Sequence, residues 1–480
     1  MKKTVLLMRM FFLGILFISA TACSDDDDGD NGGGNDDPNI VEVALETPEL
    51  ASLVLALQAA DGDLVNLLQT DGPFTVLAPN NAAFAKFLSD NGFGSVGEVP
   101  SDLLEAILLN HVIQADVSSG DLAGLGRGYT STSASGANNL PISIYFNATN
   151  GVRFNNVSAV TSGGADIDAS NGTIHIVDAV IPIPNIVDHA EANEDFRSLV
   201  SALQAADGDL LNVLKGNGPF TVLAPDNDAF GTFLDGADIG GIDKAFLSKL
   251  LLNHVIGANV SAADLVAEGS GYTKTSANGP RDQKLSLYFD TDEGVEFNGI
   301  SDVYEADIVG SNGIIHAVET VIDLPTVVTF ALADPNFETL VSALTELTPG
   351  KDYATILSRT EAGNPIDGMS PNFTVFAPTD TAFEDLFEEL GDVPGASVLI
   401  DVLDYHIVTE SNIISTDLTG NDEVTSFQGD TFTITTPGTG ENIADVDDAA
   451  GRPDIGIIGV DVQANNGVIH VLNKVMLPNL

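Results

Sequence analysis

Three stretches of the chain repeat one another closely enough to constrain how all of it folds. Each contains a block that reads Phe-Thr-Val, then Leu or Phe, then Ala-Pro, and ends in Ala-Phe; the copies occupy residues 72–84, 218–230 and 371–383. They begin roughly 150 residues apart, which is the size of a whole domain and far longer than one repeat of a solenoid. The sequence therefore predicts three tandem copies of one domain.

Two further repeated motifs contain histidine. The first reads Leu-Asn-His-Val-Ile at 109–113 and 252–256 and Asp-Tyr-His-Ile-Val at 404–408, and the second begins Asn-Gly and closes each copy at 171–177, 312–318 and 466–472. Six of the seven histidines of the chain fall in these motifs and only His189 has no counterpart. The matched residues are His111, His254 and His406 in the first motif and His175, His316 and His470 in the second.

The repeats give the domain boundaries 39–184, 185–325 and 326–480. The joints carry proline, at residues 181–184 and 324–325, and little else. Such short connections limit movement between neighbouring domains without abolishing it.

The predicted class of each domain is α+β, with helices early and strands late. In the first copy, Thr47 followed by Pro48 and Glu49 is typical of a capped helix start. Residues 74–78 form a short strand closed by proline, and Asn80 caps the next helix. Ser101 opens a further helix, and strands follow at 142–146, 151–154 and 173–177.

The N-terminus predicts export and anchoring. Residues 1–22 have a basic start, an apolar run and small residues directly before Cys23, an arrangement that resembles the lipobox of bacterial lipoproteins. The resemblance implies that Cys23, the only cysteine, is acylated and anchors the chain in a bilayer. Residues 23–38 are acidic and glycine-rich, which predicts a flexible tether. The acidic run after the cysteine resembles the surface-export signal of Bacteroidota lipoproteins, which implies the outer membrane and its extracellular face.

The charge excludes whole classes of partner. The chain has 70 acidic and 17 basic residues and a net charge of −53. Such a surface repels nucleic-acid phosphates and anionic lipid headgroups, so neither is expected to bind.

The three motifs together resemble fasciclin (FAS1) domains, and the resemblance covers essentially all of residues 39–480. It implies three tandem FAS1-type domains, each a small β-sandwich or wedge flanked by helices. It also implies a secreted or membrane-anchored protein linked to cell adhesion, matrix binding or partner recognition.

The motif histidines are candidate site residues with a structural or an adhesive role. His175, His316 and His470 lie in apolar strands without a second repeated ligand beside them, so we expect core histidines and no metal site. His111, His254 and His406 follow a helix, where we expect them to order the local fold. In animal members of the family a Tyr-His pair at this place is linked to integrin binding, and only Tyr405-His406 has both residues.

Patterns of catalysis are missing: the chain has no Gly-x-Ser-x-Gly, no His-Glu-x-x-His and no P-loop, so we expect neither an enzyme nor a cofactor. The repeated Asp-Gly-Asp at 61–63 and 207–209 indicates either a weak calcium site or, more simply, a turn that caps a helix. The third copy has twelve extra residues within 348–370, a stretch that carries Lys351, Tyr353 and Arg359. They form either a binding loop or a neutral insertion.

The sequence thus predicts a non-enzymatic, lipid-anchored surface protein that presents three fasciclin-like modules to a protein, matrix or polysaccharide ligand outside the cell. The alternative is a glycan-binding accessory lipoprotein of a polysaccharide-uptake system. The absence of tryptophan and the 6% content of aromatic residues argue against it, because glycan sites usually present aromatic platforms.

Overall fold

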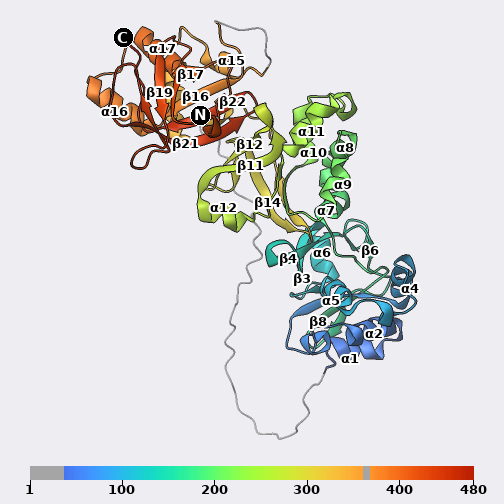
Figure 1. Ribbon diagram of the computed structural model, residues 1–480. Coiled ribbons are helices and arrows are strands. Elements are labelled where there is room, and N and C mark those ends of the chain that lie inside the picture. Colours follow the sequence, from blue (N-terminus) through green and yellow to red (C-terminus); the bar gives the residue numbers. More distant parts are fainter. Residues whose placement is uncertain (1–36, 361–367, 480) are drawn as a thin grey trace, which may run out of the picture. The chain divides into compact units, whose positions relative to one another are not determined.

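The computed structural model describes residues 37–360 and 368–479 of the chain (Figure 1). Its strands form three sheets, one for each sequence repeat. In every copy helices come first along the chain and most strands follow. The predicted α+β class and the three tandem domains are confirmed.

The first domain is built on an eight-stranded sheet. Its elements are α1 (Ile40–Glu46), α2 (Ala51–Ala59), α3 (Leu64–Leu67), β1 (Phe74–Pro79), α4 (Asn81–Asp90), α5 (Ser101–Leu109), β2 (Val112–Ile113), α6 (Ser119–Leu125), β3 (Arg127–Ser135), β4 (Pro141–Asn147), β5 (Arg153–Phe154), β6 (Ser158–Ala159), β7 (Ile167–Ala169) and β8 (Gly172–Val177). The strand order is β6-β5-β4-β3-β2-β1-β8-β7. Leu53 of α2 and Leu104 of α5 belong to the same buried cluster as Val76 of β1 and Ile174 of β8, so the main core lies between helices and sheet.

The second domain repeats this plan with seven strands in the order β10-β9-β15-β14-β13-β12-β11. Its elements are α7 (Ile186–Ala192), α8 (Arg197–Ala205), α9 (Leu210–Leu214), β9 (Phe220–Pro225), α10 (Asn227–Leu234), α11 (Lys244–Leu252), β10 (Val255–Ile256), α12 (Ala262–Glu268), β11 (Ser270–Asn278), β12 (Lys284–Asp290), β13 (Glu296–Phe297), β14 (Ser301–Val309) and β15 (Gly313–Val318).

The third domain also has seven strands, in the order β17-β16-β22-β21-β20-β19-β18. Its elements are α13 (Val327–Ala333), α14 (Glu338–Thr345), α15 (Tyr353–Leu357), β16 (Phe373–Pro378), α16 (Asp380–Leu390), α17 (Ala396–Tyr405), β17 (Ile407–Val408), β18 (Asn421–Thr425), β19 (Thr431–Thr435), β20 (Ala444–Asp447), β21 (Ile455–Ala464) and β22 (Gly467–Leu472).

The three sequence motifs lie on neighbouring strands of each sheet. In the first domain β1 carries the Phe-Thr-Val block and pairs in parallel with β8, which carries the Asn-Gly motif, so that Leu77 lies opposite His175. On its other side β1 pairs antiparallel with β2, which follows His111. The second and third domains have the same pairing. The residues that repeat most clearly are therefore those that build the centre of the fold.

A buried asparagine amide joins three parts of each domain. In the second domain, Asn312 Oδ1 accepts the N–H of Ile186 at the start of α7 (3.0 Å). Its Nδ2 donates to the carbonyls of Leu214 (2.8 Å), the last residue of α9, and of Gly216 (2.6 Å) just beyond it. Asn171 and Asn466 make the same three contacts in their domains. One side chain thus ties the first helix, the end of the third helix and the start of the closing strand together.

Contacts of backbone and side chain, and not only the short linkers, hold neighbouring domains together. At the first joint the N–H of Val309 donates to Ser143 Oγ (2.9 Å) and the N–H of Ala137 to Gly310 O (3.1 Å). A Cβ on Gly136 would lie 2.7 Å from Gly310 O, so this close approach needs glycine.

The second joint repeats the backbone-to-serine contact of the first, and basic side chains cross both joints; at the first, Arg127 pairs with Asp195 (2.8 Å). The N–H of Gln463 donates to Ser286 Oγ (2.9 Å), as Val309 does to Ser143. Lys274 Nζ donates to Asp461 O (2.6 Å), and the Arg281 guanidinium binds Asn412 O (2.9 Å) and the Asp417 carboxylate.

Most local predictions agree with the structure, and one holds only in part. The Asn80 side chain caps α4 by accepting the N–H of Ala83 (2.8 Å). Thr47 stands at the N-cap position before Pro48 as predicted, but it makes no capping hydrogen bond; its hydroxyl donates to Val43 O of α1 (2.8 Å). The sequence did not predict α1, because the helix has only seven residues, of which three are buried. Its real cap is Asn39, whose side chain accepts from Val41 and Glu42.

Replacing Asn312 with Ala should destabilise the second domain selectively. The variant leaves one N–H and two carbonyls without their partner, which costs on the order of 3–9 kcal/mol at roughly 1–3 kcal/mol per group. We expect amide hydrogen exchange in residues 186–318 to accelerate by at least a hundredfold while residues 40–177 change little. The matched variant Asn171→Ala should reverse this pattern. Equal acceleration in all domains would contradict the assignment.

Candidate functional site

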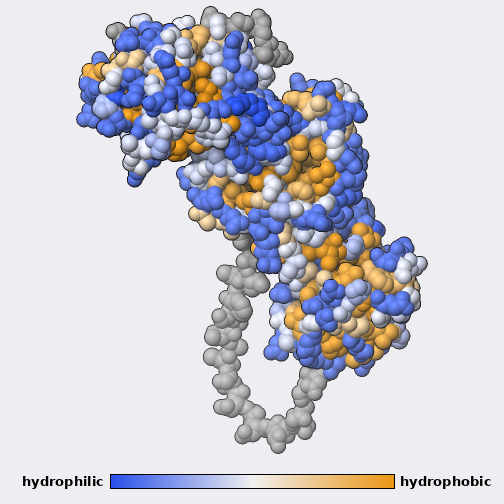
Figure 2. All heavy atoms as spheres, in the orientation of Figure 1, coloured by the Kyte–Doolittle hydropathy of each residue, from blue (hydrophilic) through white to orange (hydrophobic). Residues whose placement is uncertain are grey.

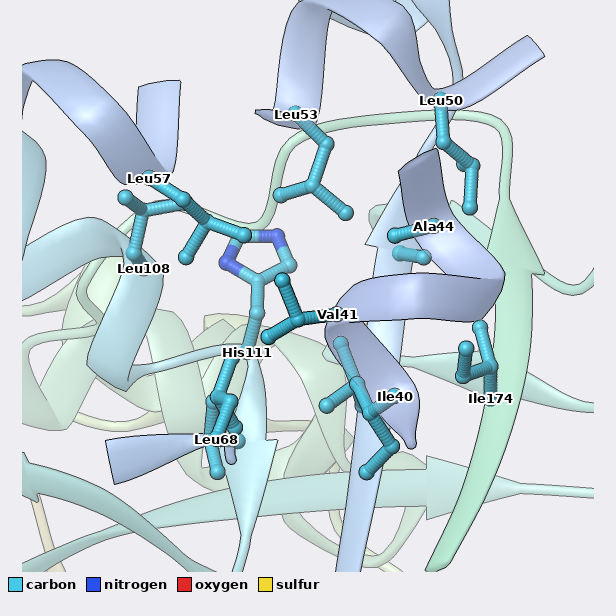
Figure 3. A pocket seen from close by; sticks show the side chains of 13 residues that line it. Ile40, Val41, Ala44, Leu50, Leu53, Leu57, Leu68, Leu108, His111 and Ile174 are labelled. Atoms are coloured by element: carbon cyan, nitrogen blue, oxygen red, sulfur yellow. The ribbon is translucent and has the colours of Figure 1, made fainter. Parts of the chain in front are cut away.

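The histidine that follows the fifth helix of the first domain is buried and fully hydrogen-bonded. His111 Nδ1 lies 2.8 Å from Ile107 O, and its Nε2 accepts the N–H of Ile181 (2.9 Å). Figure 3 shows the ring among the aliphatic side chains of Val41, Leu57 and Leu108. These partners fix one neutral tautomer, with the proton on Nδ1, because a carbonyl only accepts and an amide N–H only donates.

The equivalent histidines of the other domains have the same partners. His254 Nδ1 lies 2.8 Å from Leu250 O and its Nε2 accepts from Ile322; His406 Nδ1 lies 2.7 Å from Val402 O and its Nε2 accepts from Met476. Burial lowers the pKa of all three rings, His111 included, from 6.5 to about 4, and the carbonyl contact opposes part of that shift. Each ring ties the end of a helix to the segment that leaves the domain.

The histidines of the closing strands β8, β15 and β22 share a different set of hydrogen bonds. Nε2 of His175, His316 and His470 donates to the carbonyls of Val117 (2.9 Å), Val260 (2.9 Å) and Ile413 (2.8 Å). Nδ1 of His175 accepts the N–H of Asp166 (3.1 Å), and Nδ1 of His316 that of Asp307 (3.3 Å). Burial lowers the pKa of His316 and of His470.

Each of these histidines has an aspartate nearby, as in a catalytic His-Asp pair, but the two side chains are not hydrogen-bonded to each other. The Asp166 carboxylate approaches His175 Nδ1 no closer than 4.0 Å, and it accepts instead from the N–H of Ser119 (2.7 Å) at the start of α6. Asp461 accepts from Ser415 in the same way (2.8 Å). The aspartates therefore position loops and do not orient a general base.

Tyr405, the tyrosine of the Tyr-His pair, lies inside the third domain with 0% of its surface exposed. Its hydroxyl donates to Thr431 O (2.8 Å) and accepts the N–H of Ala449 (3.0 Å). Burial raises its pKa to about 12. The first two domains have Asn110 and Asn253 here, and both are equally buried.

The basic and aromatic side chains of the insertion in the third domain turn inward. Lys351 Nζ lies 2.7 Å from the Asp404 carboxylate, and the Tyr353 hydroxyl donates to the same group (2.7 Å). Lys351 also lies 4.7 Å from the ring centre of Phe427. Since α15 corresponds to α9, two of the extra residues precede this helix and ten follow it. Residues 361–367 of that stretch lie outside the described part of the chain.

The Asp-Gly-Asp segments form turns. Asp63 and Asp209 adopt positive φ values of 53° at the starts of α3 and α9. Their carboxylates accept from the side chains of Asn66 (2.6 Å) and Asn212 (2.8 Å), not from the helix backbone as a cap would. In the described ranges 37–360 and 368–479, no group of three His, Cys, Asp or Glu residues could hold a metal ion.

His189, which the sequence left unexplained, lies at the first joint. Its ring centre is 5.6 Å from that of Tyr129 of the first domain, and Nε2 donates to Val309 O (3.1 Å). At the second joint Phe330 takes this position, 5.6 Å from Tyr272. Alignment on the N-terminal caps of α7 and α13 would have paired His189 with Phe330 and shown an apolar contact position.

This geometry identifies the chain as an α+β protein of tandem domains. The polar side chains that repeat in the three copies form hydrogen bonds within their own domain. The chain matches the fasciclin domain at residues 48–184, 194–325 and 348–478 and belongs to the fasciclin family.

Similar proteins come from distant organisms. Human periostin is 28% identical over 320 residues, which are 66% of this chain and 35% of periostin. Pig transforming growth factor-beta-induced protein ig-h3 is 27% identical over 454 residues, 92% of this chain and 58% of that protein. An uncharacterized Synechocystis protein is 38% identical over 144 residues, 97% of its length. The chain thus spans between a third and two thirds of the two animal relatives.

Among solved structures, the FAS1 domain pair from the insect cell adhesion molecule Fasciclin I matches with a TM-score of 0.37 and 17% identity. The match covers 59% of this chain and 97% of that one.

We expect the stability of each domain to fall as the pH drops from about 6.5 to about 4. The folded second domain keeps His254 neutral down to about 4, whereas the unfolded chain binds this proton at 6.5. This stability is complete above the window and is lost through it, on the order of 3 kcal/mol per histidine.

Hydrogen exchange of residues 186–318, measured from pH 4 to pH 8 and corrected for intrinsic rates, tests this dependence. The variant His254→Leu should show a smaller dependence in this domain and leave residues 40–177 as they are. A protein whose stability is flat between pH 4 and 6.5 would contradict the assignment.

Proposed function

We propose that the chain is a non-enzymatic adhesion or interaction protein that presents its three fasciclin domains to a protein or matrix partner. The fasciclin match in all three domains is the observation that supports this most. The motif histidines and Tyr405 are buried and bonded internally, so they are not available to turn over a substrate.

Recognition then falls to the outer surfaces of the domains. Figure 2 shows hydrophilic residues over much of the visible face of the third domain, and the sequence carries a net charge of −53. Three modules on one chain raise the effective concentration of weak contacts, so a partner with repeated binding sites is held more tightly than by one domain.

The proposal includes a lipid anchor at Cys23, an acidic tether at 24–38 and display on the outer face of the outer membrane. These residues up to position 36 lie outside the described part of the chain, and support comes from their sequence alone. No helix within the described residues has the length and apolar character needed to cross a bilayer.

The glycan-binding alternative has less support. Stacking on sugar rings needs exposed aromatic faces, but in the part of the chain that the structure describes only Phe246 and Tyr304 are large, exposed aromatic side chains, each at 39%.

The variant Cys23→Ser tests the anchor. In the native host, the wild type should sediment with the outer membrane, whereas the variant, which lacks the thiol that is acylated, should appear in soluble fractions. Ser24→Ala is the matched control and should sediment like the wild type. A variant that stays in the membrane pellet would exclude this anchor.

Cell adhesion tests the role itself. Cells that carry Cys23→Ser should adhere to matrix-coated surfaces at least fivefold less than wild-type cells, and an excess of purified residues 24–480 should compete with wild-type adhesion. Unchanged adhesion in both assays would contradict the proposal.

A further inference from the structure

The third domain contains an apolar pocket between its first three helices and the sheet. Val327 and Leu332 of α13, Leu340 and Leu344 of α14, and Leu357 of α15 line it over the central strands, together with further apolar residues. Its volume is about 80 Å³. A site of this composition gives no hydrogen-bonding compensation to water, so it favours an apolar occupant.

The same place in the first domain is filled. There α1, α2 and α3 enclose a space of only about 10 Å³, which is room for roughly one water molecule. Figure 3 shows how Leu53, Leu57 and the His111 ring converge on it. His406, the counterpart of His111, does not line the pocket of the third domain. The open pocket therefore distinguishes the third domain from the first.

The pocket reaches the surface, because three of its lining residues are exposed. Leu332 has 67% of its surface exposed, the largest fraction among the exposed large apolar side chains of the described residues. Thr345 and Ala354 complete this mouth. An exposed leucine beside an open apolar pocket loses contact with water when a partner covers it.

The rim of the mouth is acidic. Glu338, Val341 and Thr345 follow the spacing i, i+3, i+7 on α14, so Glu338 lies on the face that borders the pocket. Asp352 lies two residues before Ala354 on α15 and is exposed. Among the described residues, Glu338 takes part in no ion pair.

The four basic residues of this domain have partners elsewhere. Lys351 pairs with Asp404, and Arg452 pairs with Glu389 (2.5 Å). Arg359 donates to Ile356 O (3.1 Å), and Lys474 lies 4.0 Å from the Asp454 carboxylate. An anionic amphiphile such as a fatty acid would meet repulsion at the rim, whereas a cationic partner would be attracted.

We propose that this pocket, which we call the α13–α15 pocket, receives an aliphatic side chain from a basic segment of a partner protein. The aliphatic group fills the cavity and covers Leu332, and flanking Lys or Arg residues pair with Glu338 and Asp352. The proposal takes its partner class, a protein, from the proposed function. It does not depend on the lipid anchor or on cell adhesion.

The experiment uses purified residues 24–480 and a fluorescein-labelled peptide, Gly-Lys-Lys-Leu-Lys-Lys-Gly, whose binding is followed by fluorescence anisotropy. The wild type should bind it at least fivefold more tightly than the same peptide with Ser in place of Leu. Leu332→Ser, at an exposed position that should not disturb folding, should remove this difference. Ala331→Leu, which fills the pocket, should do the same.

Leu45→Ser is the matched control, because Leu45 is the exposed counterpart of Leu332 on α1, beside the filled space of the first domain. It should leave binding unchanged. Glu338→Gln should weaken the leucine and serine peptides alike and reduce the salt dependence of binding.

Equal affinity for the leucine and serine peptides, or full binding by Leu332→Ser, would overturn the proposal. Tighter binding of laurate than of the peptide would also overturn it in favour of a lipid ligand. Because peptide binding is measured without cells, the pocket can fail while adhesion holds, and adhesion can fail while the pocket binds.

Discussion

The fold of each domain depends on one buried amide side chain. Asn171, Asn312 and Asn466 each accept a hydrogen bond from the first helix and donate two to backbone carbonyls at the C-terminal end of the third helix. Only an amide supplies an acceptor and two donors in one planar group, so neither Asp nor Leu could replace it without orphaning backbone groups. The glycine that follows each asparagine allows the closing strand to run beside the Phe-Thr-Val strand: a Cβ on Gly172 would lie 1.9 Å from Phe74 O.

The motif histidines also match the hydrogen-bonding groups of the backbone around them. A neutral imidazole has one donor and one acceptor, and each buried ring here meets a carbonyl on one side; the His111, His254 and His406 rings meet an N–H on the other. Such a ring bridges two segments of backbone that are far apart in sequence without burying a charge. In five of the six motif histidines both nitrogens are hydrogen-bonded, so these repeated side chains stabilise the domains.

The sequence predicted well what lies at the centre of each domain. The Phe-Thr-Val block forms a strand in each copy and Asn80 caps a helix as expected, since their partners lie within the same copy. The sequence did not show α1, which is short, or the joints, since Ser143 and Val309 come from different copies and neither belongs to a motif. The position of His189 against Tyr129 is hidden for the same reason.

The third domain shows how divergence at one position requires divergence at others. Asp404 occupies the place of Leu109 and Leu252 in the first histidine motif, and it is buried at 8% exposure. A buried carboxylate is costly without partners. Lys351 and Tyr353 supply them, and both come from the segment that the insertion lengthens. The lysine and tyrosine of the insertion are thus committed to Asp404 inside the domain, whereas Leu332 on α13 remains uncovered at 67% exposure.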